Sequence, residues 1–322
     1  MILTVTLNPT LDKFYWVDRL PLTLERVEEA ILIRATKSGT SAGGKGINVS
    51  TFLACMGVET VAMGFLAGHS GQIILRDILA RGCTANFVWF EGENRTNVTI
   101  IEQGKEYHPV KIHAQGPHIP PRAVESFLRK YARMLRRAEY VVLAGALPPG
   151  IPVDFYRQLV QLAKEQGVKA VVHAGRRPLK EAILAGPYVI KPDVREEAEV
   201  GDMPVRTEQE IVQAGKAALK HGVQLCLISH HVTGDILITP RGVWDLEARV
   251  PLTKYKNLVG SDDALVAGML YRLAEGDTEL DAVRFGMAAA IASAEVEPKL
   301  CLAKPAIEQE MREVEVHCKE GG

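Results

Sequence analysis

Two short segments carry residue types that suit the binding and transfer of charged groups. The first, Ser41 to Val49, reads SAGGKGINV and turns apolar and helical through Ser50 to Met56. Backbone amides that converge at a helix N-terminus suit an oxygen-rich ligand. A glycine cluster alone favours a tight turn that needs positive φ. Lys45 and Asn48 favour binding, because a cation and an amide in such a turn have few purely structural uses.

The second segment, Gly260-Ser261-Asp262-Asp263, precedes a clear helical pattern from Ala264 to Arg272. We expect a short polar strand before it, over Lys254 to Val259. The amides at 260 to 263 would form an anion hole, with one aspartate as general base. Capping of the helix by Ser261 or Asp262 explains the same residues without any chemistry. The sequence pattern alone leaves both explanations open.

Two further sites have weaker signals. Asn8 to Asp12 ends the first expected strand, and open α/β sheets bind ligands at strand carboxyl ends. An Asx-type turn is the alternative for this segment. His230 and His231 lie at a strand end, where adjacent side chains point to opposite faces and do not readily share a metal. We therefore interpret these two histidines as structural or solvent-facing.

The elements that must position these residues alternate between strands and helices. Apolar, often β-branched runs indicate buried parallel strands at Val61 to Phe65, Tyr140 to Leu143, Ala170 to Val172, Tyr188 to Ile190 and Gln224 to Ser229. Apolar residues three and four apart predict amphipathic helices at Val124 to Ala138, Asp154 to Glu165 and Gln209 to Lys220. This order predicts an α/β fold with a doubly wound, mostly parallel sheet flanked by helices.

A small β-sheet lid is expected to interrupt this alternation. Arg26 to Ser41 and Thr96 to Ile112 carry alternating strand patterns without helices between them. We predict one domain over residues 1–322, with a lid formed by about 13–41 and 96–113 inserted within it. The tail from Cys318 to Gly322 is expected to fray.

Composition narrows the class of ligand and the compartment. Lys plus Arg number 38 against 39 for Asp plus Glu, so the net charge of −1 offers no field that would gather nucleic acid or an anionic membrane. We expect a small-molecule ligand instead. The five cysteines are scattered, odd in number and free of CxxC pairs, which argues against a disulfide framework or a zinc site. Reduced thiols and the absence of a secretory signal favour a cytoplasmic protein.

Taken in order, six motifs resemble the PfkB (ribokinase-like) carbohydrate kinases. They are NPTLD at 8–12, GGKGIN at 43–48, NRTN at 94–97, GALPPG at 145–150, KPDVREE at 191–197 and NLVGSDD at 257–263. The pattern is most similar to the branch that holds 1-phosphofructokinase and tagatose-6-phosphate kinase. The resemblance spans nearly the whole chain and implies a ribokinase-like fold.

The resemblance also implies roles for individual residues. Sugar hydroxyls would be held by Asp12, Gly43, Gly44 and Asn48, and the existing sugar phosphate by Lys45, Arg95 and Arg26. Asp263 matches the base, and Gly260, Ser261 and Asp262 complete the catalytic loop. Asp193 and Glu196 match a motif associated with Mg²⁺, for which carboxylates are good ligands. Lys191, Ser229, His231 and Gly234 fall in the nucleotide site.

The nucleotide half departs from the family pattern. The usual Gly-Ala-Gly-Asp reads Gly260-Ser-Asp-Asp263, so Asp262 brings a negative charge close to the transferred phosphate. An unpaired unit charge ~4 Å from a phosphate oxygen would cost about 4 kcal/mol at an effective dielectric constant near 20. His231 replaces a glycine, and His173-Ala-Gly-Arg176 replaces Asp-Thr-Ser-Gly. These substitutions cluster in two adjoining subsites.

Two functions follow from the resemblance. The first is ATP-dependent phosphorylation, with Mg²⁺, of a sugar phosphate at a primary hydroxyl, with an activity that the altered donor site would reduce. The acceptor would be of the fructose-1-phosphate, fructose-6-phosphate or tagatose-6-phosphate type. The second is a catalytically impaired homologue that binds a sugar phosphate and regulates a partner. Family lids often form dimer surfaces, so a homodimer through the lid is a further expectation.

Overall fold

A parallel sheet forms the centre of the protein in the computed structural model, which describes residues 1–20, 32–105, 109–194, 198–297, 299 and 301–321. Its parallel strands are β1 (Ile2–Thr6), β4 (Thr60–Leu66), β5 (Thr84–Ala85), β9 (Tyr140–Ala144), β10 (Lys169–His173), β11 (Val189–Ile190) and β14 (Leu225–His231). Their order is β14-β11-β10-β9-β1-β4-β5, and the short β6 (Val88–Trp89) also pairs with β4. The predicted α/β fold class is confirmed.

An antiparallel extension continues the sheet from β14. It consists of β15 (Gly234–Thr239), β16 (Gly242–Ala248) and β17 (Val314–Gly321). The expectation that the tail frays is therefore wrong for residues 318–321. Backbone pairing with β16 orders them, although their side chains are exposed and gave no apolar signal.

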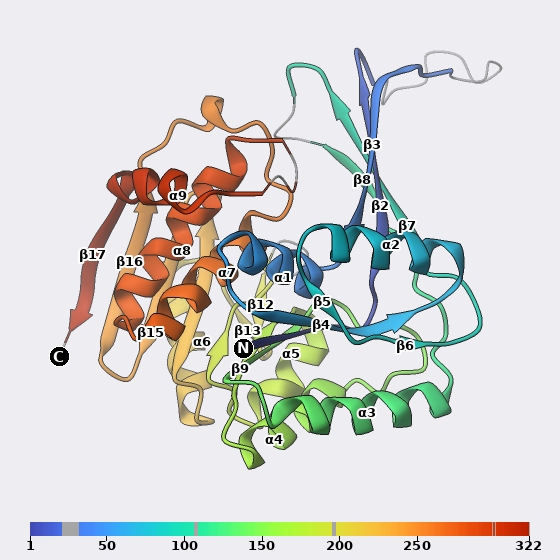
Figure 1. Ribbon diagram of the computed structural model, residues 1–322. Helices are drawn as coiled ribbons and strands as arrows, with labels where there is room; N and C mark the ends of the chain where they lie inside the picture. Colours follow the sequence, from blue (N-terminus) through green and yellow to red (C-terminus); the bar gives the residue numbers. More distant parts are fainter. Residues whose placement is uncertain (21–31, 106–108, 195–197, 298, 300, 322) are drawn as a thin grey trace.

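Helices cover both faces of the sheet (Figure 1). One face packs against α3 (Pro121–Leu135), α4 (Phe155–Glu165), α5 (Arg176–Ile183) and α6 (Glu208–Lys220). The other packs against α1 (Lys45–Cys55), α7 (Ser261–Glu275), α8 (Glu279–Ala294) and α9 (Lys304–Glu310), while α2 (Gly68–Ala80) packs beside α1 in a third cluster. In the described residues no helix is long and apolar enough to cross a membrane.

A separate four-stranded sheet projects from the body, where Figure 1 shows its strands rising together. Its order is β3 (Ala35–Gly43), β2 (Thr10–Val17), β7 (Arg95–Glu102) and β8 (Val110–Ile112). Asp12 lies within β2. The expectation that Asn8 to Asp12 ends the first strand is therefore wrong, because β1 stops at Thr6 and the chain has crossed into the small sheet by Thr10.

The segment before α7 is not the polar strand that we expected over Lys254 to Val259. It contains the turn η1 (Leu252–Lys254) and then irregular backbone. The buried Asn257 explains the difference. Its amide donates to the Val296 carbonyl oxygen (2.6 Å) and its Oδ1 accepts from the Val259 N–H (2.8 Å). The side chain thus supplies hydrogen bonds that a neighbouring strand would otherwise make.

The cysteines also differ from expectation. Cys55, at the end of α1, forms a disulfide with Cys301, which lies between α8 and α9. The prediction of only reduced thiols is wrong for this pair. The two residues are 246 positions apart, so only the packing of α1 against the C-terminal part of the chain brings them together. Cys83, Cys226 and Cys318 are free thiols.

Candidate active site

Two cavities open at the carboxyl edge of the parallel strands. The larger, of about 900 Å³, is lined by residues of β1, the small sheet and α1, among them Thr6, Asp12, Lys45 and Arg95. The smaller, of about 430 Å³, is lined by residues such as Ser229 and His231 from β14, with Ile291 from α8. They meet at the N-terminus of α7: Asp263 lines the larger cavity, Asp262 lines the smaller, and Asp193 lines both.

The N-terminus of α7 is built on Gly260. Its φ of 85° is in the left-handed region, which favours glycine, and this turn directs the chain into the helix. Gly260 is itself the N-cap residue, and no side chain caps the helix. The capping explanation for Ser261 and Asp262 is therefore wrong. The amides of the first turn and the side chains of Ser261 to Asp263 thus lie together between the cavities.

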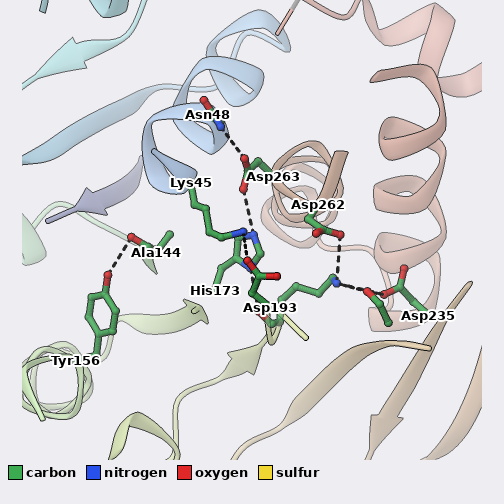
Figure 2. A network of polar contacts seen from close by, with 11 residues as sticks. Lys45, Asn48, Ala144, Tyr156, His173, Asp193, Asp235, Asp262 and Asp263 are labelled. Atoms are coloured by element: carbon green, nitrogen blue, oxygen red, sulfur yellow. Dashed lines mark hydrogen bonds and ion pairs between the residues drawn. The ribbon is translucent and has the colours of Figure 1, made fainter. Parts of the chain in front are cut away.

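Asp263 is almost fully buried, at 4% exposure, and both of its oxygens are engaged. Asn48 Nδ2 donates to Oδ2 at 2.7 Å, and His173 Nε2 lies 3.1 Å from Oδ1 (Figure 2). Burial pulls the pKa of Asp263 upward. The hydrogen bond from His173, the charge of Lys45 and the amide of Asn48 outweigh burial and hold that pKa below its usual value. Asp263 is therefore an ionised carboxylate at neutral pH.

His173 is the residue of this site whose role the sequence did not reveal. It ends β10 and is completely buried. Its Nδ1 lies 2.9 Å from the Lys191 carbonyl oxygen, which can only accept, so Nδ1 carries a proton. The contact between Nε2 and Asp263 then requires one more shared proton. With the Asp263 carboxylate ionised, a proton between Nε2 and Oδ1 makes the contact a charge-assisted hydrogen bond.

Lys191 forms an ion pair with Asp262, the carboxylate that departs from the family pattern. Its ammonium is buried, 3.4 Å from Asp262 Oδ1 and 3.3 Å from Asp235 Oδ1, and it donates to Ser229 Oγ at 2.6 Å. Ser229 in turn donates to Asp235 at 2.8 Å. The full cost estimated for an unpaired carboxylate at position 262 therefore does not apply, because a cation of the chain itself offsets this charge.

The larger cavity gathers the predicted sugar-binding side chains. Lys45, at the start of α1, pairs with Asp193 at 2.9 Å. Asp12 reaches the cavity from β2, and Gly43 on the neighbouring strand leaves room for its carboxylate. A Cβ built on Gly43 would lie 2.2 Å from Asp12 Oδ2, so any larger residue would displace the carboxylate. Gly44 lines the same cavity.

Arg95 enters the larger cavity from β7. Its terminal nitrogens donate to the carbonyl oxygens of Asn8 and Ala114, both at 3.1 Å. Its Nε is buried and has no hydrogen-bond partner among the described residues. Burial lowers the pKa of the Arg95 guanidinium. Arg95 thus joins the small sheet to the segment after β1 and presents its charge to the cavity.

The side chains of His230 and His231, which line the smaller cavity, are not arranged as the sequence predicted. The pairing of β14 with β15 shifts register between Ser229 and His231, so adjacent side chains do not simply alternate between faces. The ring centroids of His230 and His231 lie 3.8 Å apart. Both rings lie against Gly234, which leaves no space there for a Cβ. The expectation that these side chains point to opposite faces is wrong.

The remaining predicted residues are Arg26 and the two expected metal ligands, Asp193 and Glu196. Arg26 and Glu196 lie outside the described residues. Among the residues that are described, no three His, Cys, Asp or Glu side chains form a metal-binding group. Asp193 offers one carboxylate at the junction of the cavities, where oxygen ligands suit Mg²⁺.

Comparison with known proteins identifies the family to which the chain belongs. Residues 6–298 match the pfkB family carbohydrate kinases. A 1-phosphofructokinase of Borreliella burgdorferi is 30% identical over 294 residues, which cover 91% of this chain and 92% of that protein. The chain therefore belongs to the pfkB family of carbohydrate kinases, which are phosphotransferases.

Two other relatives support the same placement. A tagatose-6-phosphate kinase of Staphylococcus epidermidis is 30% identical over 295 residues, covering 89% of this chain and 91% of that protein. The crystal structure of a protein described as "Possible 1-phosphofructokinase" from Thermotoga maritima is 33% identical and superposes with a TM-score of 0.89. That superposition covers 98% of this chain and 99% of the other.

Proposed function

We propose that this protein transfers a phosphoryl group from ATP to a primary hydroxyl of a sugar phosphate. The observation that carries the proposal is the junction of two cavities at Asp262 and Asp263. An acceptor in the larger cavity and a donor in the smaller one would approach each other at that junction. The similarity to a 1-phosphofructokinase and a tagatose-6-phosphate kinase supports an acceptor of the fructose-1-phosphate, fructose-6-phosphate or tagatose-6-phosphate type.

The acceptor would be bound by polar groups from three elements. Asp12 on β2 and the turn at Gly43 and Gly44 would hold sugar hydroxyls. Lys45 and Arg95 would receive the phosphate already on the sugar, because guanidinium and ammonium groups form charge-assisted hydrogen bonds to phosphate oxygens. Both cations line the larger cavity with Asp263, so a bound sugar phosphate can present its far hydroxyl to that carboxylate.

Proton transfer would fall to Asp263. Its oxygens accept hydrogen bonds from Asn48 and His173 yet keep lone pairs for the hydroxyl proton. The depressed pKa keeps this carboxylate ready as a base at neutral pH. Closure of the small sheet as a lid would exclude water from the cavity. Positioning and electrostatics would then supply the rate, as in other phosphoryl transfers.

Residues of the smaller cavity and its floor would bind the donor. Ser229 and His231 line this cavity, Gly234 lies beneath His231, and Lys191 lies between Asp235 and Asp262. Amides at the start of α7 would face the transferred phosphoryl group. Mg²⁺, when bound with ATP, would supply positive charge to the donor phosphates, and Asp193 is one described carboxylate placed to hold it.

A regulatory sugar-phosphate-binding protein is the second candidate, and the crowded donor side favours it. Both histidine rings lie over Gly234, and Asp262 adds a carboxylate to the donor cavity. An assay with ATP·Mg²⁺ and a panel of sugar phosphates, read by ADP release and ³¹P NMR, separates the two functions. A new phosphate ester formed one-to-one with ADP supports the kinase. Calorimetric binding of a sugar phosphate without ATP binding or turnover supports the regulator and contradicts the kinase.

We also propose a cytoplasmic homodimer that associates through the small sheet. Leu32 and Ile33, just before β3, and Ile112 at the end of β8 are exposed apolar side chains, with 76%, 37% and 57% exposure. Exposed apolar groups on a lid are suited to contact with a second copy. Sedimentation of the wild-type protein and of Ile112→Lys tests this proposal, because a dimer through this surface should weaken in the variant. A wild-type monomer would contradict it.

A further inference from the structure

Asp12 has a buried partner outside the motifs considered so far. Lys299 Nζ lies 2.5 Å from Asp12 Oδ2 and 2.8 Å from the Ala42 carbonyl oxygen. Both side chains are largely buried, at 5% and 15% exposure. An ion pair with so little solvent around it is screened far less than a surface pair. Lys299 therefore fixes one oxygen of Asp12 in a defined direction.

The ion pair with Lys299 does not involve the other carboxylate oxygen of Asp12, Oδ1. Oδ1 is buried and has no hydrogen-bond partner among the described residues. Asp12 lines the larger cavity, whereas Lys299 lines neither cavity. A buried carboxylate oxygen without a partner is costly unless a ligand or water satisfies it. The lysine thus holds the carboxylate from outside the cavity and leaves Oδ1 to accept from a ligand.

Several contacts hold Lys299 in place. The Lys299 carbonyl oxygen accepts from Arg81 at the end of α2, at 2.8 Å. Arg81 also pairs with Asp77, whose Oδ2 accepts from the Ala42 N–H at 2.7 Å. Two positions further along the chain, Cys301 is bonded to Cys55 of α1. These links join Lys299 to the same body elements that support β3.

We propose that Lys299 is a positioning residue for the acceptor: it orients Asp12 so that Oδ1 meets a sugar hydroxyl, and the Cys55–Cys301 disulfide holds Lys299 in register. The inference rests on the proposed function, since it needs Asp12 to face the acceptor. Lys299 acts through Asp12 and touches neither substrate. Its loss is therefore expected to affect acceptor binding more than the chemical step.

The test is the kinetics and acceptor binding of Lys299→Met. We expect the acceptor KM and the calorimetric Kd to rise roughly 10- to 100-fold, as for loss of a charge-assisted hydrogen bond. The KM for ATP and kcat should stay within about threefold, since the remaining catalytic groups are untouched. Lys299→Arg should recover part of the affinity. The matched control is Lys37→Met, which removes the exposed ion pair of Lys37 with Glu297, at 2.6 Å, and should change neither KM.

A double-mutant cycle with Asp12→Asn separates positioning from general destabilisation. If Lys299 acts through Asp12, the double variant should bind the acceptor no more weakly than Asp12→Asn alone. Cys301→Ser should raise the acceptor KM in the same direction, and an unchanged KM would overturn the role of the disulfide.

The remaining outcomes distinguish this inference from the proposed function. An active wild type with normal acceptor binding in Lys299→Met would overturn the inference alone. A wild type that neither binds nor phosphorylates any sugar phosphate would contradict the proposed function itself.

Discussion

His173 Nε2 lies 3.1 Å from Asp263 Oδ1, and both side chains are buried at the point where the two cavities meet. The second nitrogen of His173 is fixed by the Lys191 carbonyl oxygen. The imidazole thus lies between the backbone at Lys191, just after β11, and the carboxylate proposed as base. Its hydrogen bond helps to hold the pKa of Asp263 below the usual value despite burial.

Replacement of His173 by Leu should lower kcat by roughly 10- to 100-fold, the loss expected for one charge-assisted hydrogen bond. Burial raises the pKa of Asp263 and the hydrogen bond from His173 lowers it, so the pKa should rise when this hydrogen bond is lost. Because the base must be ionised, the acid limb of the kcat/KM profile should move to higher pH. His69→Leu, an exposed histidine, is the control. A His173→Leu profile that falls uniformly without moving would contradict this role.

Replacement of Arg95 by Ala should weaken sugar-phosphate binding by roughly 1.5 to 3 kcal/mol, the range for hydrogen bonds to charged groups. Arg95 also donates to two backbone carbonyls, so the variant will lose some thermal stability. Calorimetry with the sugar phosphate and the unphosphorylated sugar separates the two effects. Loss of preference for the phosphorylated sugar supports the assignment, and an unchanged preference in a folded variant would refute it.

Replacement of Asp262 by Asn should tighten the binding of a non-hydrolysable ATP analogue with Mg²⁺. We expect a gain of roughly fivefold, less than an unpaired carboxylate would give, because Lys191 already offsets part of the charge. Addition of His231→Gly should increase the gain by opening space over Gly234. Equal or weaker binding by the variants would show that Asp262 assists the donor, for example as a ligand of the metal.

Replacement of Lys191 by Met should destabilise the fold by about 3 kcal/mol or more, because Asp235 and Asp262 lose their buried cation. Denaturant unfolding measures this change in the free energy of unfolding. Lys191→Met combined with Asp235→Asn should recover part of it, since one carboxylate charge is then removed. A double variant as unstable as the sum of the two single ones would contradict the pairing.

The sequence revealed the parts of the fold that depend on local pattern. The run TVAMGFL of β4 is buried throughout, so its apolar character alone marked a parallel strand. Asp12, Lys45, Arg95 and Asp263 were found by motif, and the structure gathers them around one cavity. Their chemical roles stay predictions.

The features that the sequence missed depend on contacts between distant segments. The Cys55–Cys301 disulfide and the ion pair of Lys299 with Asp12 join positions 246 and 287 residues apart. Lys191 was assigned to the nucleotide site, but its pairing with Asp262 requires the segment after β11 to meet the N-terminus of α7. His173 was noticed as a departure from the family pattern, and only the structure placed it against the carboxylate of Asp263.

The most direct test of the account is single-turnover phosphoryl transfer by Asp263→Asn, with Asp262→Asn as the matched control. Loss of a positioned general base should slow transfer by roughly 10²- to 10⁴-fold, while the affinity for the sugar phosphate stays close to that of the wild type. Asp262→Asn should retain transfer. Wild-type rates in Asp263→Asn together with loss of transfer in Asp262→Asn would contradict the assignment of Asp263 as the base.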